Sequence, residues 1–582
     1  MKTRMTLFRR GQGGSALILV MIMSAIALGI LASAMLWSSN SAKLTHRTIQ
    51  YTRSVAAAEA ATEKVVGQIS RDFFYGGEQL VIDNLDKYRQ TSVPTTADSP
   101  YWGTWQFNDA NGNTGQTYVQ RTPGNNYVVL DSVYAGLKGY VSTYTIVSHA
   151  SDKASVQDVT GGVFQQLQLT GIPIFQFAMY SSGNMEISCG QPFDVTGRVH
   201  SNKELFVEPD SRLTFESGVT AVVDILFQRD PVDPRGPPVG GVVYVHPDEK
   251  LAPVAAMTLP IGTTNTPENI REIIEPPPPG EDPTSPLGRL RYYNESDMVV
   301  TVSDTNVIAT SGQFDNFRTA ITNTDVALFI STNNSFYDAR EGKTVQSVDI
   351  DIGNLKTWSE TNKTPFQTLM NGAKLTSIYV VDNRSLPATS LGAVRVTHGK
   401  VLPVNGLTVA TGRPMYVLDD YNQYVDGNLG TSDTSTTRPA SLVADAITIL
   451  SDGWQDGNSR SSVDQRNAKS TTVNAALLTG VVETTSRHYS GGMENFPRFL
   501  ETWGSGNVFT YNGSMVKLFP SLYATGPWGL DNVYVPPKRN WAYDANFDDP
   551  TKLPPKTPSL LKVFRARWST VGPDTNGVAS NP

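Results

Sequence analysis

One uncharged stretch near the N-terminus constrains this chain more than any other feature. The run from Ser15 to Trp37 has 23 residues and no charged side chain. A bilayer core about 30 Å thick needs about 20 apolar residues in a helix, so this run is long enough to span it. It is longer than the apolar core of a secretory signal, about 7–15 residues. No other segment is comparably apolar, which predicts a single membrane span.

The charges before the run predict its orientation. Lys2, Arg4, Arg9 and Arg10 precede it without an acidic residue among them. By the positive-inside rule the N-terminus should stay in the cytoplasm. We therefore expect a single-pass protein of the inner (cytoplasmic) membrane, with its polar body on the periplasmic or extracellular side.

The helix is predicted to continue beyond the apolar run. Residues 38–75 contain no proline, and apolar or small residues recur at spacings of three and four, as on one face of a helix. The stripe consists of Tyr51, Val55, Ala58, Thr62, Val65, Ile69 and Phe73. A continuous helix from Ser15 to Phe74 would be about 90 Å long. Its outer half needs a partner, either the chain's own globular part or neighbouring subunits.

Composition favours short strands and turns for the rest of the chain. Of 582 residues, 39% are hydrophobic and 17% charged, with 48 glycines and 36 prolines. The net charge of −7 gives no reason to expect a nucleic-acid partner. One cysteine cannot form an internal disulfide, and Cys189 is expected to be a small apolar residue in a strand.

The N-terminus resembles a known class of export signal. Basic residues, then Gly13-Gly14, then Ser15-Ala16-Leu17-Ile18 and a long apolar helix resemble the class III signal of type IV pilin-like proteins. The pattern is most similar to the PilX type of minor pilin, and next to the GspK type of minor pseudopilin. The stretch from Ala56 to Glu63 is similar to the AEAG-like segment of those helices.

The resemblance implies processing and partners. A prepilin peptidase would cut between Gly14 and Ser15 and remove a leader, residues 1–14. Membrane lipid and other pilin-like subunits would contact the helix. Most pilins carry Glu five residues after the cut, where this chain has Leu19. GspK-like and many PilX-like members also lack that Glu, so the departure favours a minor, tip or initiating component over a bulk pilin.

The fold is predicted to be mainly β behind one long helix. We expect the helix over residues 15–75, a small antiparallel β domain over 76–172, and a β-solenoid-like body over 173–540. Strand centres about 30 residues apart suggest stacked coils, and a β-sandwich is the competing arrangement. Residues 229–290 are predicted to form a proline-rich excursion, residues 291–372 an inserted α+β lobe, and residues 541–582 an irregular tail.

Parts of the body also resemble other proteins. The segments 197–202, 336–342, 406–411 and 509–513 are similar to uncharacterised large proteins with a PilX N-terminus, of the kind found in Verrucomicrobia and Planctomycetes. That resemblance implies an architecture and no activity.

Chemistry-bearing residues are sparse. The six histidines are scattered, and His200 and His398 are expected at strand ends without a metal. We predict no cofactor. An oxygen-rich loop of Asp452, Asp456, Gly457 and Asn458 lacks the twelve-residue pattern of a calcium loop and is interpreted as a solvated turn.

Seven tryptophans lie in loop-like contexts. Aromatic rings can stack on sugars or partner proteins, but here they are more often expected to cap small cores. They are Trp102, Trp105, Trp454, Trp503, Trp528, Trp541 and Trp568.

Three functions remain open at this point. The favoured one is a non-enzymatic, membrane-anchored minor pilin-like protein of a type IV pilus or type II secretion-like system, displaying a β-rich domain for assembly or adhesion. Surface polysaccharide is a further candidate partner. The rival is a membrane-tethered β-helix enzyme acting on carbohydrate, with Asp420, Asp445 and Asp452 lining one groove. Asp419-Asp420 with His398-Gly399 has the reverse of the order found in polygalacturonases. The third is a passive envelope scaffold.

Overall fold

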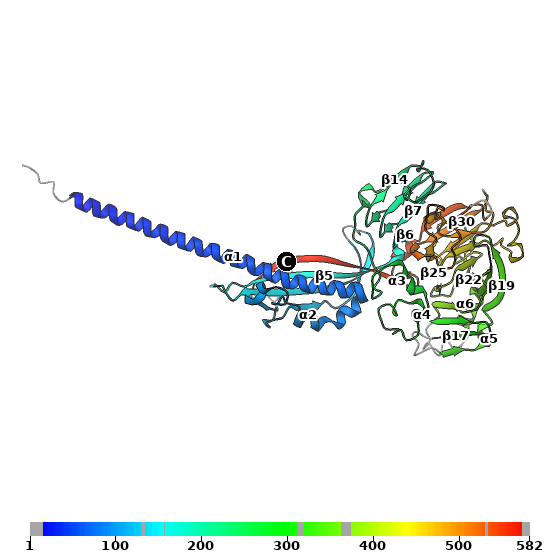
Figure 1. Ribbon diagram of the computed structural model, residues 1–582, viewed down its shortest axis with the longest axis horizontal. Helices are drawn as coiled ribbons and strands as arrows, with labels where there is room; N and C mark the ends of the chain where they lie inside the picture. The colour runs from blue at the N-terminus through cyan, green and yellow to red at the C-terminus, as the bar shows by residue number, and fades with distance from the viewer. Residues whose placement is uncertain are drawn as a thin grey trace, which may run out of the picture.

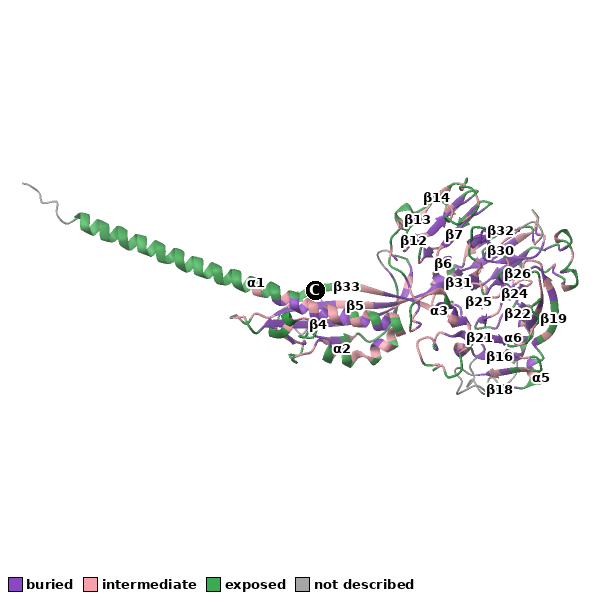
Figure 2. Ribbon diagram, viewed as in Figure 1, coloured by how far each residue is buried: buried purple, intermediate pink, exposed green. Residues whose placement is uncertain are grey.

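A long helix projects from the rest of the protein (Figure 1). The computed structural model describes residues 15–572 except 131–133, 135, 156, 312–318, 362–373, 505 and 530–532. Helix α1 (Ser15–Asp83) has 69 residues and leaves helical geometry at Gly76 and Gly77, where Gly77 has a φ of +72°. The prediction of one continuous helix to Phe74 is confirmed. Figure 2 shows its N-terminal half exposed on every side and its C-terminal half packed.

The packed half of α1 covers an antiparallel sheet, as predicted. The strand order is β1-β4-β5-β33, with β2 and β3 also paired to β4. Helix α2 (Leu85–Thr91) follows the bend in α1. The strands are β1 (Trp105–Asn108), β2 (Tyr118–Arg121), β3 (Asn126–Val129), β4 (Lys138–Asp152), β5 (Gly161–Pro173) and β33 (Ser559–Val571).

Small residues let helix and sheet approach closely. Ala58 and Ala61 are completely buried. A Cβ atom at Gly161, where β5 begins, would lie 2.6 Å from the backbone nitrogen of Val55. Of the predicted stripe, the five positions from Ala58 onward are buried, whereas Tyr51 is 39% exposed. The stripe therefore finds its partner within the chain, and only from residue 54 onward.

The C-terminal segment returns to this sheet. Strand β33 pairs with β5 from Ser559 opposite Pro173 to Val571 opposite Gly162. The prediction of an irregular tail over residues 541–582 is therefore wrong for residues 559–571, where Leu560 and Leu561 are buried in the core. Because β5 and β33 are neighbours, everything between them is an insertion into the N-terminal sheet.

The inserted body begins with three stacked coils of three short strands each. Met179 pairs in parallel with Val199, and Val199 with Val219, so the first two coils take 20 residues each, fewer than the predicted 30 or so. The third coil, from Val219 to its partner Lys250, and the later ones, such as that from Leu407 to its partner Ala440, do have about the predicted length. The coils are β6 (Met179–Ser181), β7 (Met185–Ile187), β8 (Phe193–Val195); β9 (Val199–Ser201), β10 (Leu205–Val207), β11 (Leu213–Phe215); and β12 (Val219–Ala221), β13 (Ile225–Leu226), β14 (Val242–Tyr244). Strand β15 (Lys250–Leu251) extends the first sheet.

The remaining coils approach from the other end of the stack. The largest sheet has the order β15-β12-β9-β6-β31-β28-β25-β23-β21-β16-β17-β18, parallel from β15 to β16. Its later strands are β16 (Met298–Val302), β17 (Val307–Ser311), β18 (Thr319–Ile321), β21 (Ser377–Asp382), β23 (Leu407–Thr411), β25 (Ala440–Ala444), β28 (Ala476–Val481) and β31 (Met515–Pro520). The chain thus starts mid-stack at β6, leaves, re-enters at the far end and winds back until β31 lies beside β6.

Two further sheets of the body lie in the same part of the chain as the later strands of the large sheet. One has the order β19-β20-β22-β24-β26-β29 and the other β27-β30-β32. Their strands are β19 (Ile330–Asp338), β20 (Lys343–Asp351), β22 (Ser390–Thr397), β24 (Met415–Leu418), β26 (Ile447–Leu450), β29 (Arg498–Phe499), β27 (Thr471–Asn474), β30 (Val508–Gly513) and β32 (Lys538–Tyr543).

The segment between the two groups of coils is packed, contrary to the predicted proline-rich excursion. Residues 252–297 run along the outer face of the large sheet and carry α3 (Pro267–Arg271) and α4 (Tyr292–Glu295). Ile270, Ile273 and Ile274 are at most 2% exposed, in one core with Val443 and Leu478 of the sheet. We name residues 252–297 the strap.

Residues 291–372 do not form a separate lobe over the part that is described. Strand β16 pairs with β21 and β20 with β22, so both belong to the body's sheets. Helices α5 (Asn323–Val326) and α6 (Ile352–Thr361) flank them.

The tight helix–sheet contact makes two glycines testable. Gly161→Val should destabilise the full chain by about 1–3 kcal/mol, because the new side chain would overlap the backbone of α1. Gly67→Ala should stabilise it by about 0.5–1 kcal/mol, because Gly67 lies in the helix with nothing within 4 Å of a Cβ. Thermal unfolding in detergent measures both variants, and equal shifts of the same sign would contradict this packing.

Candidate functional site

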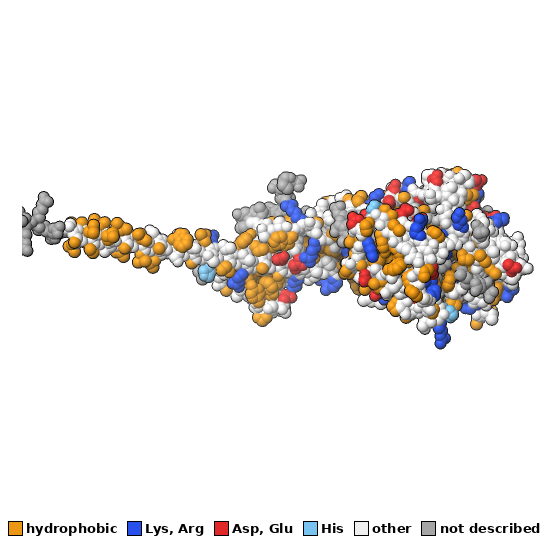
Figure 3. Space-filling model, turned by 90° about the horizontal axis from the view of Figure 1, so that it is seen from above, with side chains coloured by type: hydrophobic (Ala, Val, Ile, Leu, Met, Phe, Trp, Pro, Cys, Tyr) orange, Lys and Arg blue, Asp and Glu red, His pale blue; other side chains and the backbone are white. Residues whose placement is uncertain are grey.

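The exposed half of α1 is the first candidate functional element. Every residue from 15 to 49 is exposed. Within α1 an 18-residue window has a mean hydropathy of 2.6 and no buried residue, so the helix is long and apolar enough to cross a membrane. Figure 3 shows hydrophobic side chains along its length. Ser15 is its first residue, Leu19 is 64% exposed, and Gly14 lies outside the described residues.

The three carboxylates of the enzymatic alternative have separate partners. Asp445 is fully buried and accepts hydrogen bonds from Arg271 of the strap (2.7 Å) and from the backbone N–H groups of residues 522–524 (2.6–3.0 Å). Asp420 accepts from the backbone of Thr472 (2.8 Å), and Asp452 pairs with Lys469 (2.8 Å). Asp445 therefore forms a buried ion pair with Arg271 and does not line a groove with Asp420 and Asp452.

The oxygen-rich loop is engaged by nitrogen donors. Asp456 accepts from Arg395 (2.7 Å) and from the indole of Trp454 (2.8 Å). With Asp452 paired to Lys469, both carboxylates already face donors, and the turn interpretation agrees with these contacts.

The cysteine and the two histidines singled out from the sequence have structural settings. Burial raises the pKa of the Cys189 thiol to about 12, so it is unreactive. His200 is buried between Thr220 (2.8 Å) and Asn202 (3.0 Å), and burial lowers its pKa to about 4, which keeps it neutral. The exposed His398 lies 2.9 Å from Asp351.

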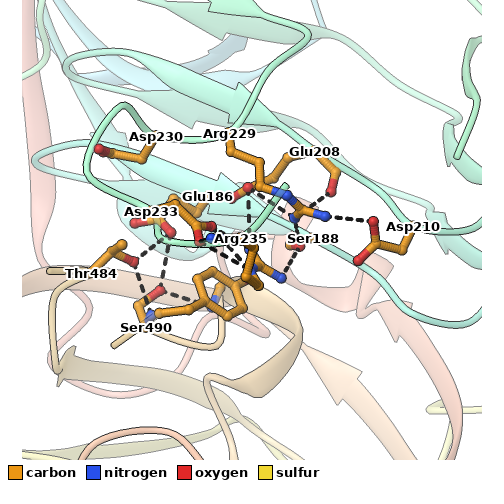
Figure 4. Close-up of polar contacts among 12 residues, drawn as sticks. Glu186, Ser188, Glu208, Asp210, Arg229, Asp230, Asp233, Arg235, Thr484 and Ser490 are labelled. Carbon is orange, nitrogen blue, oxygen red and sulfur yellow. Dashed lines mark hydrogen bonds and ion pairs between the residues drawn. The ribbon is translucent and has the colours of Figure 1, made fainter. Parts of the chain in front are cut away.

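A cluster that the sequence did not reveal lies on the first coils (Figure 4). The carboxylate cluster consists of Glu186, Glu208 and Asp233, which can each place an oxygen within 4.8 Å of the others. Glu186 lies on β7 and Glu208 directly follows β10 on the next coil. Asp233 comes from the loop between β13 and β14, so coil stacking and one insertion bring the three together.

Two arginines of that loop neutralise the carboxylate cluster. Arg229 and Arg235 both lie 3.3 Å from Oε2 of Glu208. Arg235 also pairs with Asp233 (2.6 Å), and Arg229 with Asp210 (2.5 Å). Both guanidinium groups donate to Oγ of Ser188 at 2.9 Å. The network fastens the loop to two successive coils.

The network does not suit a divalent cation. Calcium prefers six to eight oxygen ligands, whereas guanidinium groups already contact the same Glu208 oxygen and would repel an ion. Burial, and next the Glu186 carboxylate, raise the pKa of Glu208 to about 9. Glu208 can therefore hold a proton at neutral pH, which lowers the charge of the carboxylate cluster without a metal.

Comparison with known proteins adds little to this geometry. No family model and no curated protein matches the chain. A solved structure, the competence-associated pilin ComZ from Thermus thermophilus, aligns with 90% of this chain and 98% of that chain, at 9% identity and a TM-score of 0.27. A score this low does not establish a shared fold.

The carboxylate cluster gives a pH-dependent prediction. The pKa of Glu208 is higher in the folded chain than its ordinary value of 4.5, so its contribution to stability is complete at low pH and is lost as pH rises toward 9. Glu208 should contribute a fall in stability of about 1.4 kcal/mol per pH unit, in addition to the falls from Glu494 and Glu501, whose pKa values burial raises to about 7. Glu208→Gln, which stays uncharged, should flatten that fall in thermal unfolding between pH 5 and 9.

A matched change separates this effect from general charge. Glu216→Gln removes an exposed carboxylate on the following turn and should leave the pH slope of the wild type unchanged. Parallel slopes for the wild type and the Glu208 variant would show that Glu208 is ionised throughout.

Proposed function

We propose that this chain is a membrane-anchored, minor pilin-like structural protein that displays a β-rich body for assembly or adhesion. The observation that carries the proposal is the division of α1 into two halves. Residues 15–49 are exposed, the uncharged run of residues 15–37 within them is long and apolar enough to cross a bilayer, and the same helix continues onto a small antiparallel sheet. A helix whose first half has no partner within the described chain is suited to lipid or to other helices of the same kind.

The body is proposed to be a β-solenoid. The parallel stacking of the coils from β6 to β14 supports this reading. Its insertion between β5 and β33 places it at the end of the sheet remote from the membrane helix (Figure 1). In this proposal residues 1–14 are the leader, residues 15–75 the anchor helix, and residues 76–172 with β33 the pilin-like domain.

The proposed setting is the inner membrane, with the N-terminus in the cytoplasm and the body outside it. Partners are membrane lipid, a prepilin peptidase and other pilin-like subunits of a PilX-like or GspK-like system, without an enzymatic activity. Leu19 is exposed on the apolar half, so this chain offers no carboxylate to a neighbour there. That supports a minor component over the bulk subunit.

Leader processing tests the proposal directly. The full chain produced with an active prepilin peptidase should begin at Ser15 on N-terminal sequencing, and Gly14→Val should keep Met1. A control pilin processed in the same cells must show that the peptidase is active. An intact wild-type N-terminus beside a processed control would rule out the pilin-like reading and leave a tethered scaffold.

Helix-to-helix assembly can be tested by cross-linking. The single native cysteine is buried, so an introduced thiol dominates the reaction. Ser39→Cys lies on the exposed half of α1 and should cross-link to other subunits in membranes that contain the pilus or secretion system. Ser54→Cys is buried against the sheet and should not. Equal cross-linking at both positions would contradict subunit contacts through the exposed half of α1.

A further inference from the structure

A pocket of about 270 Å³ opens beside the carboxylate cluster. It lies where the turns of the first two coils meet the loops that follow β28 and β31. The turns contribute Gln191 and Asp210, and the loops contribute Tyr489, Glu494, Asn495 and Trp528. Ligand sites generally occupy about 300–1,000 Å³, so this pocket suits one small ring.

Trp528 differs from most of the chain's tryptophans. Trp105, Trp454, Trp503 and Trp541 are buried and pack in cores, as expected from the sequence. Trp528 is only half-buried, at the wall of the pocket. Its indole N–H donates to the hydroxyl of Tyr534 (3.1 Å), which donates to the side-chain oxygen of Asn495 (3.0 Å). The ring is therefore held in one orientation before any ligand arrives.

Two glycines shape this wall. Gly491 and Gly492 have φ values of +92° and +65°, a backbone conformation that other residues rarely adopt. A Cβ at Gly491 would lie 2.7 Å from the Trp528 ring, and one at Gly492 would lie 2.5 Å from the Tyr489 hydroxyl. The turn thus lets both aromatic rings pack directly against the backbone.

Hydrogen-bonding groups line the rest of the pocket. Glu494 is 2% exposed and accepts from the backbone N–H of Ser188 at 3.2 Å. Arg539 donates to Asn495 (3.2 Å), while its Nε is buried and has no hydrogen-bond partner among the described residues. Asp210 keeps 37% of its side chain exposed beside its pair with Arg229. The pocket therefore combines the planar guanidinium of Arg539 and the carboxylates of Asp210 and Glu494 with the indole ring of Trp528.

We propose that this pocket binds one neutral pyranose unit of a polysaccharide. The apolar face of a sugar ring stacks on an indole, and vicinal hydroxyl groups need neighbouring donors and acceptors. The Arg539 guanidinium, the exposed part of the Asp210 carboxylate and the exposed Gln191 amide line the pocket and supply them. Phosphate and uronate are disfavoured, because Arg229 and Arg235 are already paired with carboxylates and Asp210 would repel an anion, which leaves the Arg539 guanidinium to donate to hydroxyl groups. This inference rests on the proposed function in one respect: the body must lie outside the membrane, where it can meet a polysaccharide.

Binding is tested on the full chain in nanodiscs, because glycoside detergents would compete. Neutral oligosaccharides of glucose, mannose, galactose and N-acetylglucosamine are probed by saturation-transfer NMR, beside oligogalacturonate and a phosphorylated oligosaccharide. We expect a neutral member to bind with a dissociation constant of about 1 mM, as suits a small single-ring site. Trp528→Ala should weaken it at least tenfold and Trp528→Phe only slightly.

One control variant and one further test variant accompany this experiment. Trp568→Ala removes an exposed indole on β33 and should not change binding. Gln191→Ala changes an exposed residue at the rim, should not affect folding, and should weaken binding. No binding across the panel, binding unaffected by both the Trp528→Ala and Gln191→Ala changes, or binding of acidic sugars alone would overturn the inference. Leader cleavage is measured separately, so either proposal can fail without the other.

Discussion

The pairing of β33 with β5 is the constraint on which the rest of the structure depends. It joins the C-terminal strand to the sheet that packs on α1, across the whole length of the inserted body. Closing so long a loop costs conformational entropy, although that cost grows slowly with length. The pairing also requires the body to begin and end at nearly the same place, since Pro173 and Ser559 lie opposite each other.

The order of strands in the body meets this requirement. A stack that grew in one direction from β6 would leave its last coil far from the N-terminal sheet. Here three coils extend one way, the strap crosses the outer face of the large sheet, and the later coils wind back until β31 pairs with β6. The strap fills a second core with Ile270, Ile273 and Ile274, and Arg271 ties it to buried Asp445. Its tight packing is thus a consequence of the return path.

The N-terminal helix and its buried face can be predicted from the sequence, whereas much of the body cannot. The apolar run and the stripe at Ala58, Val65 and Ile69 predict the helix and its buried face, because periodicity is a local signal. The role of β33 depends on a partner nearly 400 residues earlier in the chain. The 20-residue register of the first coils places the apolar residues Met185, Leu205 and Ile225 opposite one another, but strands of two or three residues are too short to show a periodicity.

The pocket could not be predicted for a related reason. Its residues come from coil turns and from loops far along the chain, which meet only because β31 returns to β6. Loops at the corners of stacked coils can change without disturbing the sheets, so binding groups gather there at little cost to the fold. The network of Glu208, Arg229 and Arg235 fastens the loop between β13 and β14 to the coil turns on one side of the pocket. In this chain the return of β31 to β6 brings the coil turns and the distant loops together, and the pocket lies where they meet.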